Sequence, residues 1–303
     1  MKILFFSHDG KLGDAILHTS FVKGIKERLP NAQLFCTTAG ATSQFWQRDN
    51  RISKSWVFNK KNLWETIKFA WMLRSIKLDY IIAWNLIRAE KLRFLCWLAN
   101  PKYGVKIYTI SDNEHASQKE WKALCNLLPD ELFLQPIPYD IPLPKLARKW
   151  DKEAILLNCF GNDERRSLLL NEALFLIKEI NRVMPKVKIY LTYIDRNQDF
   201  VKKIIERNEC KQIEEVNCQD DIDRLVSLCV HVKVVITPDT SIVHLASTFN
   251  CPVIAIFKKD PILITNWAPK SSNYIIVQSK QNENIHGFSI EEVVKSLHEL
   301  YKY

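Results

Sequence analysis

The stretch KILFFSHDGKLGDAILHTSFVKGIKERLPNAQLFCT, residues 2–37, contains the pattern that predicts the fold. Lys2–Phe6 is short, apolar and rich in strand-forming residues, and a polar loop with two glycines follows it. Asp14–Leu29 then places apolar residues at helical spacing, and Pro30 with Asn31 ends the helix. Gln33–Thr37 is a second candidate strand. A strand–helix–strand start of this kind indicates an α/β fold with a parallel sheet.

The same alternation continues along the chain and is interrupted once. Residues 135–144, QPIPYDIPLP, hold four prolines, which disfavour both helix and central strand and indicate a linker. We therefore expect an N-terminal domain over residues 1–140, a second domain over 151–288 and a closing helix over 289–303. Before the linker the pattern predicts strands at 56–58 and 80–83 and a helix at 63–76. After it come predicted strands at 154–159, 187–192, 232–237 and 253–257, and helices at 168–183, 199–207, 222–229, 240–249 and 289–301.

Length and composition fit a globular protein of two domains, or of one large domain. The 303 residues are 47% hydrophobic and 25% charged, which excludes a wholly disordered chain. No uncharged apolar run approaches the roughly 18 residues of a membrane-spanning helix, and the N-terminal apolar stretch is too short for a signal peptide. Eight cysteines without a CxxC pair suggest reduced thiols in a cytosolic protein, with neither a disulfide framework nor a zinc site.

Positive charge is concentrated in the first half of the chain. Residues 1–150 hold 23 Lys and Arg against 13 Asp and Glu, whereas residues 151–303 hold 20 against 21. Such a surface would attract an anionic partner, and the absence of nucleic-acid-binding motifs makes nucleic acid the weaker candidate. The segments 63–76 and 89–98 mix aromatic residues with Lys and Arg, which suits a membrane surface. For either segment alone, an ordinary amphipathic helix packed on a sheet is the favoured interpretation.

The loop after the first strand is the first candidate site, because ligands bind beyond the carboxyl ends of the strands in open parallel sheets. Gly10 and Gly13 would let the backbone turn tightly and approach a ligand. Asp14 would then lie at a helix start, either as a general base toward a hydroxyl or simply as an N-cap. The residues alone do not separate these two roles. The glycine spacing is not GxGxxG, which argues against a dinucleotide fingerprint.

Two further loops follow predicted strands of the second domain. Asp239, Thr240 and Ser241 are strong capping residues at the start of a helix whose N–H groups suit a pyrophosphate. His244 lies on the next turn, where packing is the better interpretation from the residues alone. In residues 159–167 a glycine permits a tight turn, and two arginines, Arg165 and Arg166, could bind phosphate oxygens.

At these residues the chain resembles glycosyltransferase family 9, the heptosyltransferases of lipopolysaccharide core assembly. One signature is the run Gly13-Asp14-Ala15-Ile16-Leu17-His18-Thr19 after a strand. The other combines Asp239-Thr240-Ser241 with His244-Leu245-Ala246 and Pro252. Their order, separation and strand–loop–helix context match the family over most of the chain.

The resemblance implies a GT-B fold, in which two Rossmann-like parallel-sheet domains face each other across a cleft. It implies cytoplasmic placement and an inverting, metal-independent transfer without a cofactor, with Asp14 as the catalytic base. The donor, most simply ADP-heptose, would have its diphosphate held by Asp239, Thr240, Ser241, His244, Arg165 and Arg166. Gly10, Lys11, Gly13 and His18 would lie on the acceptor side.

The acceptor implied by the resemblance is an acidic glycolipid of the lipid A–inner core type. The basic first half of the chain would then draw the protein to the inner face of the cytoplasmic membrane as a peripheral protein. Two alternatives remain open: the same machinery with a hexose or N-acetylhexosamine donor, and a GT-B module that binds glycolipid without turnover.

The sequence departs from the family pattern in two places. Arg165 and Arg166 stand near a position where the family commonly has Lys, and Ser241 stands where many members have Gly. The string Asp221-Ile222-Asp223 has the DxD form that binds metals in other glycosyltransferases. Because it precedes a predicted helix, we expect helix capping there.

Overall fold

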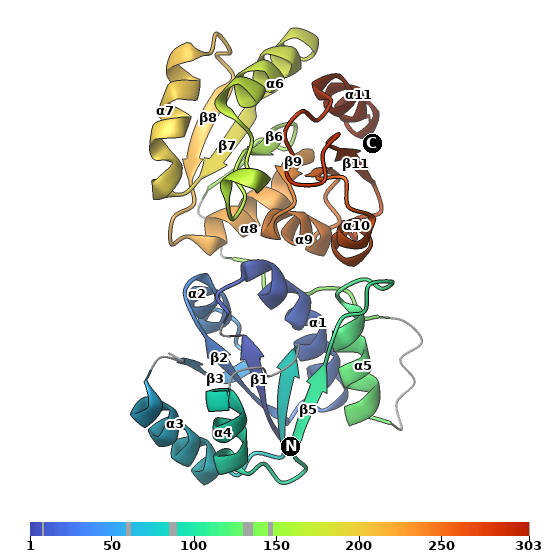
Figure 1. The fold of residues 1–303 in the computed structure, drawn as a ribbon. Helices are drawn as coiled ribbons and strands as arrows, with labels where there is room; N and C mark the ends of the chain where they lie inside the picture. The colour runs from blue at the N-terminus through green and yellow to red at the C-terminus, as the bar shows by residue number, and fades with distance from the viewer. Residues whose placement is uncertain (8, 59–61, 85–89, 130–135, 145–147, 303) are drawn as a thin grey trace. The chain divides into compact units, whose positions relative to one another are not determined.

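The computed structural model describes the chain except for residues 8, 59–61, 85–89, 130–135, 145–147 and 303. The chain divides into two compact units, Met1–Pro142 and Leu143–Tyr303. Each unit is built on a parallel sheet with helices on both faces (Figure 1). The predicted α/β fold with two parallel-sheet domains is therefore confirmed.

Unit 1 has a five-stranded sheet in the order β3-β2-β1-β4-β5. Phe5 on the central strand packs against His18, Phe21 and Trp46, so α1 and α2 cover this face of the sheet. Its neighbours Leu4 and Phe6 point to the opposite face, into a core made with α3 and α4. The elements of unit 1 are β1 (Lys2–Ser7), α1 (Leu12–Arg28), β2 (Gln33–Thr38), α2 (Ala41–Gln47), β3 (Ile52–Val57), α3 (Leu63–Ile76), β4 (Tyr80–Trp84), α4 (Glu90–Ala99), β5 (Val105–Tyr108) and α5 (Gln118–Leu127).

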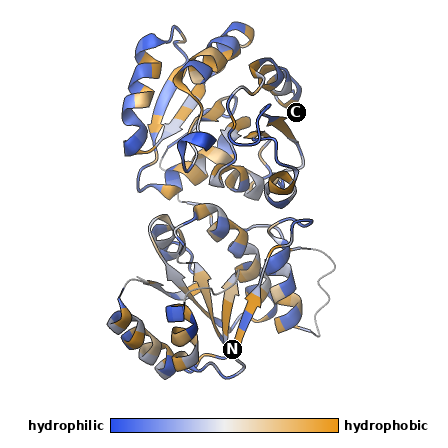
Figure 2. Ribbon diagram, in the orientation of Figure 1, coloured by the Kyte–Doolittle hydropathy of each residue, from blue (hydrophilic) through white to orange (hydrophobic). Residues whose placement is uncertain are grey.

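Unit 2 has a six-stranded sheet in the order β11-β10-β9-β6-β7-β8, and every residue of its inner strands β6, β9 and β10 is buried. Figure 2 colours the ribbon by hydropathy, with hydrophobic residues in orange. Both faces of such a sheet are covered by helices, which is why these strands show no polar alternation. Its strands are β6 (Ile155–Asn158), β7 (Ile189–Tyr193), β8 (Ile213–Asn217), β9 (Val234–Pro238), β10 (Val253–Phe257) and β11 (Tyr274–Gln278). Its helices are η1 (Glu164–Arg166), α6 (Leu170–Val183), η2 (Asp195–Asn197), α7 (Gln198–Arg207), α8 (Ile222–His231), α9 (Ser241–Thr248), α10 (Pro261–Trp267) and α11 (Ile290–Leu300).

The sequence pattern missed strands that lie at the sheet edges. The missed strands β5, β8 and β11 are all outermost, and the short sequences VKIY of β5 and IEEVN of β8 carry charged residues. An edge strand is only partly buried, so its apolar signal is weaker than that of a central strand. The first helix also begins at Leu12, two residues earlier than expected. Gly13 is therefore inside the helix, and only Gly10, with φ of 74°, makes the left-handed turn.

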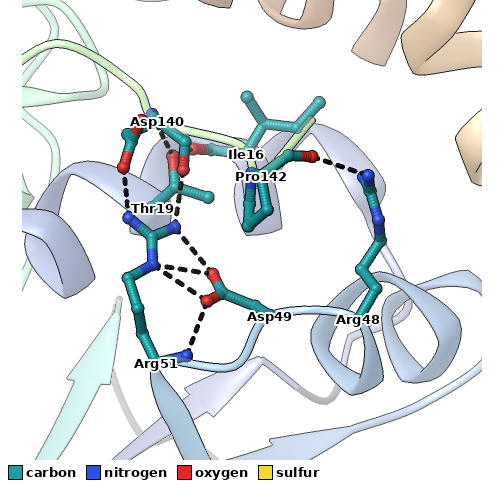
Figure 3. Close-up of polar contacts among 7 residues, drawn as sticks. All are labelled: Ile16, Thr19, Arg48, Asp49, Arg51, Asp140 and Pro142. Carbon is teal, nitrogen blue, oxygen red and sulfur yellow. Dashed lines mark hydrogen bonds and ion pairs between the residues drawn. The ribbon is translucent and has the colours of Figure 1, made fainter. Parts of the chain in front are cut away.

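Residues 139–142 end unit 1, and a group of polar contacts fastens them to it (Figure 3). Arg51 donates to both carboxylate oxygens of Asp49 and to the carboxylate and carbonyl of Asp140. The Asp140 amide donates to Thr19 Oγ1 at 3.0 Å, and Arg48 donates to the Pro142 carbonyl at 2.6 Å. Asp49 is only 3% exposed, so the guanidinium of Arg51 neutralises a buried carboxylate.

Replacing Arg51 with Met should therefore destabilise unit 1 strongly. The substitution leaves the Asp49 carboxylate buried without its partner, which typically costs about 3–5 kcal/mol. Urea denaturation should show a lower midpoint, while Lys54→Met on the exposed part of β3 should stay within about 0.5 kcal/mol of the parent chain. Equal stability of Arg51→Met and the parent would show that the polar contacts of Arg51 do not stabilise unit 1.

Candidate functional site

Asp14 lies on the first turn of α1, at the carboxyl edge of the unit 1 sheet. The helix begins at Leu12 and its N-cap residue is Lys11, so Asp14 is not the N-cap. Lys11 makes no capping hydrogen bond with its side chain. The Asp14 side chain keeps 13% of its surface exposed and is paired with Lys119 Nζ at 3.2 Å. The ion pair with Lys119 therefore fixes the Asp14 carboxylate, while its exposed part can still contact a ligand.

Three buried ionisable side chains lie behind Asp14. Lys119 and Glu120, both on α5, and His18 on α1 are almost completely buried. Glu120 Oε1 lies 2.7 Å from His18 Nδ1 and 3.8 Å from Lys119 Nζ. The His18 ring also stacks on Trp84 with a centroid distance of 4.7 Å. We call Asp14, Lys119, Glu120 and His18 the buried charge cluster.

The cluster sets the ionisation of Asp14. Burial raises the pKa of this carboxyl, but the charge of Lys119, assisted by His18 and Lys11, outweighs burial and leaves the pKa below its ordinary value. The two neighbouring carboxylates in turn outweigh the effect of burial on Lys119 and raise the pKa of its ammonium group. Asp14 is therefore ionised at neutral pH and chemically able to accept a proton.

The structure changes the expected roles of several residues on this side. His18 is 2% exposed and contacts Glu120 in the interior of unit 1. It is therefore not part of the accessible surface on the acceptor side. Gly10 provides the turn after the first strand, whereas Gly13 is helical. Lys119 and Glu120 carried no signal in the sequence, because they lie in an ordinary helical stretch about a hundred residues after Asp14 and no motif marks them.

In unit 2, four loops meet around a small polar pocket of about 110 Å³. They follow β6, β9, β10 and β11, which are neighbours in the sheet, so their carboxyl ends lie side by side. The pocket is lined by Asp163, Arg165, Arg166, Asp239, Lys258, Leu263, Glu283 and Ile285. The structure thus brings together the predicted Arg165, Arg166 and Asp239 and adds Lys258 and Glu283.

Asp239 is a buried carboxylate that engages one of the two arginines. Its Oδ2 lies 3.2 Å from Arg166 Nη1, whereas Arg165 is more exposed and lies 3.7 Å from Asp163. Burial raises the pKa of Asp239, and the charges of Arg166 and Lys258 oppose that rise. Lys258 directly follows the predicted strand 253–257, so the rule that loops after strands carry ligands would have found it.

The helix after β9 starts as expected for a capped helix. Thr240 is its N-cap, and its Oγ1 accepts a hydrogen bond from the Ile242 amide at 3.2 Å. Ser241 is the first helical residue. His244 is 3% exposed, and its ring lies 5.7 Å from that of Trp267, so it packs inside unit 2 and does not line the pocket.

The DxD string caps a helix, as predicted. Asp221 is the N-cap residue of α8, and its Oδ1 accepts from the Arg224 amide at 2.9 Å. Across the described residues, no three His, Cys, Asp or Glu side chains are grouped so that they could hold a metal ion. Nor does any helix in the described part of the chain have the length and apolar character needed to cross a membrane.

Comparison with known proteins finds a family match in the second half of the chain. Residues 185–298 match the model of glycosyltransferase family 9 (heptosyltransferase). A search of curated proteins found no match. Among solved structures, a family 9 glycosyl transferase from Veillonella parvula is 14% identical with a TM-score of 0.81, covering 99% of this chain and 97% of its own.

Two heptosyltransferase structures from E. coli are also similar. ADP-heptose lipopolysaccharide heptosyltransferase II is 13% identical with a TM-score of 0.78, covering 100% of this chain and 99% of its own. A heptosyltransferase solved with ADP is 13% identical with a TM-score of 0.69, covering 99% of this chain and 100% of its own. The structural matches share the two-domain GT-B fold, and the family match lies in unit 2. The resemblance predicted from the sequence is thus confirmed, and the chain is a glycosyltransferase that carries the family 9 domain.

Proposed function

We propose that the protein is an inverting, metal-independent glycosyltransferase of lipopolysaccharide core biosynthesis, which transfers heptose from ADP-heptose to an inner-core acceptor. The observation that carries the proposal is Asp14, an ionised and partly exposed carboxylate at a carboxyl sheet edge in a chain with the family 9 domain. The names of the similar E. coli structures, one with ADP-heptose and one solved with ADP, support this donor. A different nucleotide sugar, or glycolipid binding without turnover, would be the alternatives.

In the proposed reaction, unit 1 supplies the base. Asp14 takes the proton of the acceptor hydroxyl as its oxygen attacks the anomeric carbon. The bond between that carbon and the diphosphate oxygen breaks on the opposite face, and its electron pair stays on the nucleotide diphosphate. Attack opposite to the leaving group inverts the anomeric configuration. Lys119 keeps Asp14 ionised and fixes its orientation before the acceptor arrives.

Unit 2 supplies the positive charge for the leaving group. Arg165, Arg166 and Lys258 line the polar pocket, and the α9 N-terminus begins beside it at Asp239 and Thr240. We assign the phosphate contacts to these cations and the helix terminus, and assign to Asp239 the task of orienting Arg166. Cations placed where charge develops can lower the barrier without a metal ion.

Gly161 shapes the loop that carries these arginines. A Cβ at this position would lie 2.4 Å from the Arg166 carbonyl oxygen and 2.5 Å from its Cβ, contacts that backbone atoms cannot relieve easily. The Gly161 amide also donates to Ser167 Oγ at 2.9 Å. The close approach brings Arg166 back over the end of β6, and only glycine permits it.

The acceptor side of the proposal follows from charge. The excess of Lys and Arg lies in residues 1–150, which form unit 1 and the beginning of unit 2. We propose an acidic glycolipid of the inner-core type as acceptor, and peripheral association with the inner face of the cytoplasmic membrane. Electrostatic attraction of this kind weakens as ionic strength rises.

Binding of ADP, UDP, GDP and CMP tests the donor. A ligand at 100 times its dissociation constant adds about 2.7 kcal/mol of stability, so ADP should raise the melting temperature most. Arg166→Ala should weaken ADP binding about tenfold because a charged contact is lost, whereas Arg182→Ala on the exposed face of α6 should not. Stabilisation by UDP or GDP alone would contradict the ADP-sugar donor.

Substitution of Asp14 by Asn tests the base. The side chain keeps its shape but cannot accept the proton, so kcat for sugar transfer should fall by about 10²–10⁴. The ADP affinity of unit 2 should stay the same, which calorimetry can measure. Undiminished transfer by Asp14→Asn would exclude this carboxylate as the base, and a parent chain without any transfer would favour the binding module.

The Lys119 ion pair predicts a pH dependence. Since the base must be ionised, activity is present above the pKa of Asp14 and lost as pH falls through it. In Lys119→Met the burial of Asp14 remains but the lysine charge is gone, so the acidic limb of the kcat/KM profile should move to higher pH. Lys119→Arg should restore the profile toward that of the parent, and Lys23→Met on α1 should not change it. If the acidic limb of the Lys119→Met profile stayed at the pH of the parent, Lys119 would not control the ionisation of Asp14.

A further inference from the structure

The outer face of α3 and α4 in unit 1 carries unusually exposed aromatic residues. Trp64 is 73% exposed, Trp71 58%, Phe94 38% and Trp97 72%. We call these four side chains the aromatic face. Single exposed apolar residues are ordinary, but large aromatic groups gathered on neighbouring helices mark an interaction surface. The folding of unit 1 does not need them, because its core on this side of the sheet is made by other residues of the same helices.

Helical geometry brings these side chains onto one surface. Trp64 and Trp71 are seven residues apart on α3 and therefore point the same way, while Ala70 and Leu73 point into the core. Phe94 and Trp97 are neighbours on α4, with ring centroids 5.8 Å apart. The two helices pack side by side against one face of the sheet (Figure 1).

The surface around the aromatic face is basic. In residues 52–57, 63–84 and 90–108 there are eight Lys and Arg against three Asp and Glu. One of those acids, Asp79, accepts from the Lys2 amide, while the other two, Glu65 and Glu90, lie on the first turns of the helices. Arg74 lies 5.7 Å from the Trp71 ring centre, and Lys102 lies 4.7 Å from that of Tyr103. Lys68, which lies between Trp64 and Trp71 along α3, and Arg93, which directly precedes Phe94 on α4, are both exposed.

We propose that the aromatic face docks unit 1 on the surface of an anionic lipid bilayer. Tryptophan rings favour the interface between headgroups and acyl chains, and Lys and Arg beside them are attracted to anionic headgroups. A protein partner would meet the same aromatic side chains, but the excess of positive charge specifically complements anionic lipid. Beside Trp97 the surface is hollowed into a groove of about 400 Å³ along the edge strand β5.

The docking surface rests on the proposed function, because it would bring the base close to a membrane-held acceptor. Each helix that follows a parallel strand begins at the carboxyl edge of the sheet, and α1, α3 and α4 all do so. Trp64 is on the first turn of α3 and Asp14 on the first turn of α1. The aromatic face therefore extends to the sheet edge at which Asp14 is exposed.

Vesicle sedimentation tests the docking surface. The full chain should bind vesicles of phosphatidylethanolamine with about a third phosphatidylglycerol more tightly than phosphatidylcholine vesicles, and added salt should weaken that binding. The triple variant Trp64→Ser/Trp71→Ser/Trp97→Ser should lower the partition constant by at least about tenfold. Lys68→Gln/Arg93→Gln should lower it by roughly fivefold per charge. Phe175→Ser/Ile205→Ser removes exposed apolar groups of unit 2 and should change nothing.

Three results would overturn the docking surface. The first is that the parent chain does not bind anionic vesicles. The second is that the triple tryptophan variant binds them as tightly as the parent. The third is that this variant loses a dimer and keeps vesicle binding. Circular dichroism checks that the variants fold, which is expected because the substituted side chains are exposed.

Asp14→Asn separates this proposal from the proposed function. It should bind vesicles as the parent does while losing transfer, and the triple tryptophan variant should still transfer to a water-soluble acceptor fragment. Vesicle binding without any transfer by the parent would keep the docking surface and remove the proposed reaction. Transfer by a parent chain that does not bind vesicles would support the proposed reaction and exclude the docking surface.

Discussion

Parallel strand pairing is the constraint on which both candidate sites depend. A parallel neighbour can be reached only through a crossover, so every loop that follows a strand emerges at the same edge of its sheet. In unit 2 this gathers the loops after β6, β9, β10 and β11, although they are spread over more than a hundred residues of chain. In unit 1 it places the first turn of α1 at the corresponding edge. The topology of each sheet therefore brings these loops together whatever side chains they carry.

The buried charge cluster shows what accurate placement of one carboxylate requires. Taking a lysine and a glutamate out of water is unfavourable unless each finds a partner of opposite charge. Here the partners are supplied by two helices, with Lys119 between Asp14 and Glu120, and Glu120 against His18. Such an arrangement adds little to stability compared with apolar packing. It leaves the Asp14 carboxylate ionised and fixed in orientation, with part of its surface still exposed.

The two units divide the work of the molecule by charge and by surface. In the proposed function, unit 1 would combine the base, Asp14, with a basic, aromatic exterior that suits an acidic lipid-linked acceptor. Unit 2 combines a small polar pocket, whose lining includes three basic side chains, with a capped helix terminus, and we propose that these bind a phosphorylated leaving group. In the proposed function, positive charge would act in two ways: the excess in the first half of the chain would attract an anionic surface, and individual cations in unit 2 would stabilise the leaving group.

The sequence by itself determined the parallel α/β architecture, the position of Asp14 at a helix start, the loop with Asp239 and Thr240, and the capping role of Asp221. These features are encoded locally, because periodicity and capping act over a few residues. Only the tertiary structure decided that Lys119 pairs with Asp14, that Lys258 joins Arg166, and which aromatic side chains stay outside. Those contacts join residues far apart in the chain, and they depend on which strands become neighbours and how helices pack on them. The edge strands β5 and β8 were hidden for a related reason, since partial burial weakens the apolar pattern from which a strand is predicted.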